Sequence, residues 1–224
     1  MGVKLAICFS SPGKKYPFYP AHFIQARRCC MKVVIATKNK NKVKEIKEKF
    51  RDVDHIDFLS LEEYPQAPDV IEDGSTFEEN ALKKARAISE FTGLAAMADD
   101  SGLEVDALEG RPGIYSARYA GENATDRERN EKLLREMEKV EDRKANFTCV
   151  IAIALPDGSH HLVRGTCDGT ISLSPSGEGG FGYDPVFFLP QYDKTMAEIP
   201  LEEKNRISHR AHALEGALKI IETL

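Results

Sequence analysis

Two adjacent carboxylates after an apolar run constrain this chain more than any other feature. The run spans Leu94 to Met97, and Asp99 and Asp100 follow it after Ala98. Such a run indicates a buried strand, and ionised acids beside it need a metal or cations because burying an unpaired charge is costly. Gly102 predicts a sharp turn, which would place both acids on a strand-end loop. The alternative is a strand-to-turn junction whose acids are solvated.

Length and charge limit the class of protein. The chain has 224 residues, of which 42% are hydrophobic and 30% charged, and its formal net charge is −5. This length suits a soluble protein of one large domain or of two lobes that share a core. No apolar run approaches the ~18 residues of a membrane span, so no membrane partner is expected. The negative charge argues against a nucleic-acid partner.

Residues 1–30 differ in composition from the rest of the chain. They carry five basic residues, no acidic residue and three of the five cysteines. A targeting peptide, a disordered tail and an upstream extension compete as interpretations. We favour the extension because Met31 directly precedes a β-branched strand. We therefore expect residues 1–30 to lie outside the functional fold and residues 31–224 to form a single domain of two lobes.

The remaining cysteines, Cys149 and Cys167, are two isolated residues. They have neither the density of a disulfide framework nor the spacing of a metal-binding motif. This pattern favours a reducing compartment, and we predict a cytoplasmic location.

Helices alternate with strands in the first half of the chain, and a hairpin dominates the second. Residues 32–36 predict a strand, and 41–50 show helical apolar spacing. Thr76 and Glu79 form a capping box that begins a helix ending at Gly93. Further predicted elements are a helix over 126–140, a hairpin of 146–155 with 161–165, a Gly-rich loop over 177–185 and a helix from Ser208. We expect an α/β fold with an elongated mixed β-sheet flanked by helices and a cleft between two lobes.

The loop between the first strand and its helix is rich in anion-binding groups. Together with backbone N–H groups at a helix N-terminus, its side chains would form an anion cradle. The loop contains no glycine, so it is not a Walker loop, and a lysine-rich surface turn is the alternative. Its residues are Thr37, Lys38, Asn39, Lys40, Asn41 and Lys42.

Lys84 lies on the apolar face of the predicted second helix, with Phe77 and Ile88, whereas Lys83 points to the opposite side. An inward lysine needs an anion, either a phosphate or the acid pair, unless its stem reaches solvent. Glu72 lies in a turn before this helix and is free to reach the cleft. With Asp100 it would make a hard-oxygen site suited to Mg²⁺.

Two later segments carry candidate ligand-binding groups. The segment 179–185 combines glycines, which allow close backbone approach, with Phe181 and Tyr183, which can stack on a planar base. An ordinary Gly-rich turn with core aromatics is the alternative. Ser208 is a candidate N-cap, so His209 and Arg210 would project as donors from a helix N-terminus. A solvated basic turn would have the same composition.

These motifs together resemble a known family, the Ham1-like inosine/xanthosine triphosphate pyrophosphatases. The resemblance covers essentially residues 31–224. Its motifs are Thr37-x-Asn39-x-x-Lys42, Thr76-Phe77-x-Glu79-Asn80-Ala81 with Lys84, Ala98-Asp99-Asp100-Ser101-Gly102, Pro112-Gly113-Ile114-Tyr115-Ser116-Ala117-Arg118, Gly180-Phe181-Gly182-Tyr183-Asp184-Pro185 and Ile207-Ser208-His209-Arg210.

The resemblance implies an ITPase-like homodimer that hydrolyses ITP, dITP and XTP to the monophosphate and pyrophosphate with Mg²⁺. It implies that residues 37–42 and Lys84 hold the triphosphate and that Glu72 and Asp100 hold the metal. Asp100 would also orient or deprotonate the attacking water, supported by Asp99 and Ser101. The residues implied around the base are Phe181, Gly182, Tyr183, Asp184, Lys204, His209 and Arg210.

Base selection would follow from hydrogen-bond polarity. Donors such as His209 and Arg210 favour a 6-oxo purine, because the 6-amino group of adenine would leave them unpaired. Two alternatives stay open at this point. One is a Maf-like pyrophosphatase for modified pyrimidine nucleotides, and the other is a nucleotide-binding module without catalysis.

Overall fold

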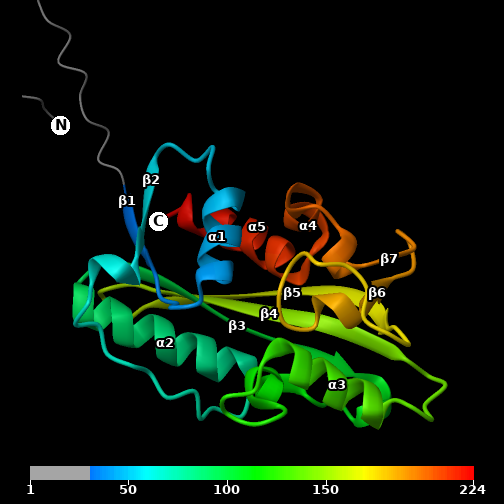
Figure 1. Ribbon diagram of the computed structural model, residues 1–224. Coiled ribbons are helices and arrows are strands. Elements are labelled where there is room, and N and C mark those ends of the chain that lie inside the picture. The colour runs from blue at the N-terminus through cyan, green and yellow to red at the C-terminus, as the bar shows by residue number, and fades with distance from the viewer. Residues whose placement is uncertain (1–30) are drawn as a thin grey trace, which may run out of the picture.

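The computed structural model describes residues 31–224, so the predictions for residues 1–30 lie outside the described residues. One seven-stranded sheet, in the order β2-β1-β3-β4-β5-β6-β7, runs through the molecule with helices on both faces (Figure 1). The predicted α/β class with a mixed sheet is confirmed. The strands are β1 (Met31–Ile35), β2 (Ile56–Ser60), β3 (Ala95–Val105), β4 (Lys144–Ala154), β5 (His160–Ile171), β6 (Phe187–Leu189) and β7 (Lys194–Thr195). The helices are α1 (Lys40–Lys49), α2 (Phe77–Thr92), α3 (Asp126–Glu136), α4 (Leu201–Ile207) and α5 (His209–Ile221).

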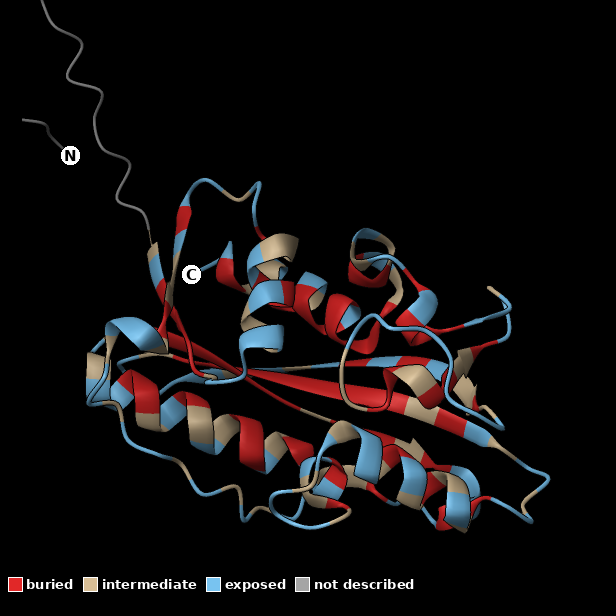
Figure 2. Cartoon of the chain, in the orientation of Figure 1, coloured by how far each residue is buried: buried red, intermediate tan, exposed pale blue. Residues whose placement is uncertain are grey.

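The helices form two layers. In Figure 1, α1, α4 and α5 lie above the sheet, and α2 and α3 lie below it. Strand β1 pairs in parallel with β2 and β3, whereas β3, β4 and β5 pair antiparallel. The parallel pairs follow from helical crossovers, and the β4–β5 pair follows from a tight turn at Gly158 with φ +88°. Figure 2 shows the buried residues along the central strands and on the helix faces turned toward them.

The two predicted lobes correspond to separate parts of the apolar core. Near β1 and β2, α1 and α5 pack on one face around Ile35 and Leu214, and α2 packs on the other around Ala81 and Val150. The far halves of β3, β4 and β5 form another cluster with α3 and β6, which includes Phe187. The long strands therefore run through both lobes and hold them together.

The acid pair lies in the middle of a strand, so its predicted position on a strand-end loop is wrong. Strand β3 continues through Asp99 and Asp100 to Val105, and both acids pair with β4. On the other side, β1 ends opposite Met97, so within the described residues no strand covers that edge of β3 beside the acids. The acids therefore face the site from the central sheet, where the neighbouring strand stops.

Gly102 does not make a turn either. A side chain there would bring its first carbon to 2.3 Å from the Gly113 carbonyl oxygen and 2.5 Å from Ser116 Oγ. The glycine is needed because residues 113–118 pack directly on β3. This packing leaves β3 extended.

Several element boundaries also differ from the predictions. Helix α3 ends at Glu136 rather than near residue 140, the hairpin strands are longer, and β2, α4, β6 and β7 were not predicted. Thr76 does cap α2 by accepting from the Glu79 amide, but the Glu79 carboxylate accepts from Ser75 instead of closing the box. No helix in the described part of the chain is both long and apolar enough to cross a membrane.

Candidate active site

A cavity of about 500 Å³ opens where β1 ends, between the two lobes. Its volume lies within the range of small-ligand sites. It brings together most of the predicted site residues, which come from α1, α2, β3, α4, α5 and the segments that connect the strands and helices. Those lining it are Thr37, Lys38, Asn39, Asn41, Lys42, Glu72, Lys84, Asp100, Ser101, Phe181, Gly182, Tyr183, Asp184, Lys204, His209 and Arg210.

Two predicted residues do not line this cavity. Asp99 lies buried beneath it, and its contacts are described below. Lys40 borders a second cavity, between α1 and residues 60–67. The predicted loop over residues 37–42 is shorter than expected, because α1 begins at Lys40. Of these six residues, Lys40 alone does not line the first cavity.

The loop before α1 is organised by Asn39 rather than by free backbone amides. Asn39 Oδ1 accepts from the Asn41 and Lys42 amides at 3.0 and 3.3 Å, so part of the predicted anion cradle is already satisfied by the N-cap. Lys38 forms an ion pair with the exposed Asp69 at the rim. Lys42 lies in the first turn of α1 rather than in the loop, and its ammonium points inward, 3.0 Å from Asp99 Oδ2.

Asp99 belongs to a buried network on the α1 and α5 face of the sheet. Arg210 donates to Asp99 Oδ2 from Nε at 3.1 Å and from Nη2 at 3.0 Å, and it donates to Glu45 Oε2 at 2.6 Å. Lys204 continues the network to Glu45 at 2.8 Å and Asp184 at 2.6 Å. Three acids thus face three cations, Lys42 included, and the network is electrically balanced.

The pKa values in this network follow from burial and charge. Burial alone would raise the pKa of Asp99, but Lys42 and Arg210 hold that pKa well below its usual range. The pKa of Glu45 is also lowered, because Arg210 and Lys204 outweigh its burial. At Asp184, burial outweighs Lys204 and the pKa is raised.

This geometry corrects the prediction that Arg210 projects as a free donor. Its side chain is 2% exposed, and it also donates to Ser101 Oγ at 2.9 Å. Four of the five N–H groups of a guanidinium are therefore engaged by Asp99, Glu45 and Ser101. Its main contacts hold the floor of the cavity together.

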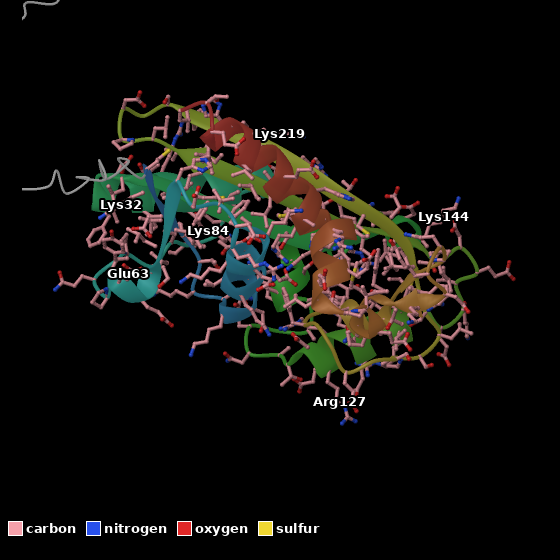
Figure 3. The ribbon with its side chains drawn as sticks, turned by 90° about the horizontal axis from the view of Figure 1, so that it is seen from above. Lys32, Glu63, Lys84, Arg127, Lys144 and Lys219 are labelled. Atoms are coloured by element: carbon pink, nitrogen blue, oxygen red, sulfur yellow. The ribbon has the colours of Figure 1, made fainter. Side chains whose placement is uncertain are left out.

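Asp100 faces the opposite side of the sheet, toward α2, because successive strand residues alternate. Lys84 Nζ lies 3.7 Å from Asp100 Oδ1 and 3.1 Å from Glu72 Oε1. Asn80 Nδ2 donates to Asp100 Oδ2 at 3.1 Å. Lys84 lies within the body of the molecule in Figure 3, unlike Arg127 at its edge, and its side chain is 12% exposed. The predicted inward direction of Lys84 is confirmed.

This second cluster carries an excess of negative charge. Two carboxylates, Glu72 and Asp100, share the single ammonium of Lys84. Burial raises the pKa of Asp100 to about 6, although Lys84 and Lys42 oppose that shift. The raised value is that of a carboxylate whose charge is not fully compensated.

The donor set of this cluster fits a divalent cation. The described residues contain no group of three or more His, Cys, Asp or Glu side chains placed to hold a metal ion. Mg²⁺ needs no such group, because one or two carboxylates suffice when water and phosphate oxygens complete its octahedron. The carboxylates of Glu72 and Asp100 both lie within ion-pair distance of the Lys84 ammonium, so they are close enough to each other to share a small cation.

The predicted base end is built around Phe181. Its half-buried ring has Lys204 Nζ 4.8 Å and Arg210 Cζ 5.6 Å from the centroid. Tyr183 packs in the core and donates to the Ser116 carbonyl at 2.9 Å, so Phe181 is the more accessible of the two rings. His209 stacks on Phe147 with centroids 4.6 Å apart. Burial holds the pKa of His209 well below its usual range, so the imidazole is neutral.

Sequence reasoning missed Glu45, Asn80 and Asp126. Glu45 lies off the apolar face of α1 and is buried only because α4 and α5 supply its partners, so no periodic signal marks it. Asn80 lies one turn before Lys84 on the same helix face, and that spacing could have identified it. Asp126 lines the cavity from the start of α3, and its contacts depend on the tertiary fold.

The fold and the cavity define the class of protein. It is an α/β protein with a cleft beside its central sheet, and cations and paired carboxylates cluster at that cleft. Residues 33–220 match the model of the Ham1 family, and the chain belongs to that family. The chain is 53% identical over 196 residues to a dITP/XTP pyrophosphatase of Desulforamulus reducens, which covers 87% of this chain and 97% of the relative.

Solved structures agree with this assignment. A HAM1 protein from Coxiella burnetii superposes with a TM-score of 0.80 at 43% identity, over 87% of this chain and 100% of that one. The Ham1 protein of Staphylococcus aureus gives a TM-score of 0.78 at 45% identity, over 86% and 98% of the two chains. The family resemblance predicted from the motifs is confirmed.

Proposed function

We propose that this protein hydrolyses non-canonical purine nucleoside triphosphates, namely ITP, dITP and XTP, to the monophosphate and pyrophosphate. The observation that carries the proposal is the cluster of Asp100, Glu72 and Lys84, which has a net negative charge and lies in the same cavity as the electrically balanced network around Arg210. The names of the relatives, dITP/XTP pyrophosphatases, support the same activity.

Asp100 is the candidate for handling the attacking water. Burial raises the pKa of Asp100 to about 6 in the metal-free protein, so this carboxylate is ionised at neutral pH and can accept a hydrogen bond from a water molecule or bind a cation. Asn80 and the Ser101 amide hold its two oxygens, at 3.1 Å each, and so orient it. Hydrolysis at the α-phosphorus needs a water in line with the leaving pyrophosphate, which a fixed carboxylate can align.

Charge compensation is the second requirement of this reaction. Lys42 and Lys84 line the same cavity and can approach phosphate oxygens. We infer Mg²⁺ as the cofactor, held by Glu72 and Asp100; when bound it would neutralise part of the triphosphate charge. Thr37, Asn39 and Asn41 add polar groups at this end.

The base would lie at the other end, against the Phe181 ring. His209 Nδ1 is buried and has no hydrogen-bond partner among the described residues, so it retains hydrogen-bonding capacity beside the cavity. In the tautomer that carries the proton on Nδ1, His209 would donate to the 6-oxo group of a purine, whereas the 6-amino group of adenine would leave that donor unpaired. Selection against ATP by about 10- to 100-fold is expected from one such mismatch.

A panel of nucleotides with Mg²⁺ tests the proposal. ITP, dITP and XTP should release pyrophosphate rather than phosphate, at a kcat/KM well above that of ATP. Faster pyrophosphate release from dUTP or dTTP would instead support the Maf-like activity. Tight ITP binding without turnover would reduce the protein to a nucleotide-binding module.

Two further properties stay predictions: a homodimer, which the resemblance implies, and a cytoplasmic location, which the cysteine pattern favours. The homodimer can be tested by light scattering of the purified chain, where a monomer mass would contradict it. The cytoplasmic location can be tested by fractionating the source cells.

A further inference from the structure

The start of α3 holds the backbone of Gly182 from both sides. Asp126 Oδ2 accepts from the Gly182 amide at 2.7 Å, and Asn130 Nδ2 donates to the Gly182 carbonyl at 3.1 Å. Asp126 and Asn130 are four residues apart, so they project from the same helix face. Gly182 adopts φ +64°, a left-handed conformation that favours glycine. The two contacts hold the backbone in this conformation.

This pair is itself anchored. Arg129 forms an ion pair with Asp126 and donates to the carbonyls of Ala117 and Ala124 at 2.8 and 2.5 Å. Asn130 is buried, whereas the Asp126 side chain is 45% exposed and borders the cavity. The first turns of α3 therefore form a rigid support for the loop.

The neighbours of Gly182 are held by other groups. The Phe181 amide donates to Asp184 at 2.8 Å, and the Tyr183 hydroxyl reaches Ser116. The Phe181 carbonyl also accepts from the Asp184 amide at 3.2 Å. These contacts leave the amide and the carbonyl of Gly182, which belong to the peptide groups on its two sides, to Asp126 and Asn130. The direction of the Phe181 ring depends on those peptide groups, because Gly182 has no side chain to restrict its backbone.

We propose that Asp126 and Asn130 are positioning residues that set the Phe181 ring for purine binding. The inference rests on the proposed function and goes beyond it by assigning base recognition to a helix that need not touch the substrate. Loss of either contact would loosen the Phe181–Gly182 segment and weaken base binding. The phosphate end should be unaffected, because the ion pairs of Lys42, Lys84 and Asp100 are made with Asp99, Glu72 and each other and not with residues of α3.

The test compares Asp126→Ala with Glu128→Ala. Both variants remove one acid from the first turn of α3, but Glu128 caps Thr125 and does not contact Gly182. Steady-state kinetics with ITP gives KM and kcat, and inhibition by pyrophosphate reports on the phosphate end alone. Thermal melting reports on folding.

For Asp126→Ala, we expect KM for ITP to rise about tenfold, the preference for ITP over ATP to narrow, and the pyrophosphate inhibition constant to stay within about twofold. Asp126→Asn should recover most of the loss, since its amide oxygen can still accept from Gly182. Asn130→Asp, which removes the donor, should repeat the effect of Asp126→Ala. Glu128→Ala should leave KM unchanged even if it lowers the melting temperature.

Three results would overturn the inference. They are an unchanged KM in Asp126→Ala, an equal rise in KM for Glu128→Ala, and a parallel loss of ITP and pyrophosphate binding. A wrong proposed function would give a different result, because the unmodified protein would then not hydrolyse ITP at all.

Discussion

Asp99 and Asp100 are neighbours in sequence, yet they belong to two different electrostatic environments. Asp99 faces α1 and α5, where its charge is part of a buried network with equal numbers of acids and cations. Asp100 faces α2, where two carboxylates share Lys84. The pKa of the first is lowered and the pKa of the second is raised to about 6.

The difference teaches how one strand can supply both structural and reactive groups. Alternation on β3 sends adjacent side chains to opposite faces, so each meets a different helix layer. A fully compensated carboxylate stabilises the fold and is a poor base. An under-compensated one has affinity for a proton or a metal, and it lies beside the cavity.

The largest effect is expected from removing the charge of the under-compensated acid. Asp100→Asn should lower kcat by about 10³-fold or more, since it removes both a metal ligand and the group that handles water. Pyrophosphate release from ITP measures it. Asp73→Asn, an exposed acid near Glu72, is the matched control and should retain full activity. Turnover by Asp100→Asn at the normal rate would remove Asp100 from catalysis.

A large loss of stability is expected on the compensated side. Asp99→Asn should lower the free energy of unfolding by about 3–5 kcal/mol, because it leaves the buried Arg210 short of a counter-charge. Asp69→Asn breaks an exposed ion pair with Lys38 and should cost less than about 1 kcal/mol. Urea unfolding distinguishes the two variants. Equal decreases in the free energy of unfolding would mean that Asp99 contributes no more to stability than a surface acid does.

The raised pKa of Asp100 predicts a pH dependence of stability in the metal-free protein. A folded-state pKa above the unfolded value near 3.9 gives stability that is present below that value and is lost as pH rises through about 6. Asp100→Asn should therefore gain about 3 kcal/mol over the unmodified protein between about pH 4 and pH 8. Melting temperatures in a chelator measure this gain. A gain that does not change with pH would contradict the assignment.

The smallest effect is expected at Glu72, whose side chain is 39% exposed. Glu72→Gln should raise the Mg²⁺ concentration for half-maximal rate about tenfold, with kcat at saturating metal within a few-fold of normal. Glu78→Gln, an exposed acid that pairs with Arg164, is the control and should not shift the metal requirement. A fall in kcat that excess metal does not restore would place Glu72 elsewhere in the mechanism.

Local patterns predicted much of the fold. The helix at residues 77–92, the cap at Ser208, the hairpin turn at Gly158 and the inward direction of Lys84 all follow from spacing or turn chemistry within a few residues. The short strands β6 and β7 were not predicted, because they form only by pairing with other strands.

The sequence by itself determined that two carboxylates and an inward lysine would meet in an α/β fold, because periodicity and composition are local properties of the chain. Only the tertiary structure decided that the acids lie within β3 and that Arg210 is engaged by Asp99 and Glu45. The charge balance of a buried network depends on residues from several elements packed together. That balance, which separates Asp99 from Asp100, exists only once β3, α1, α4 and α5 are in place.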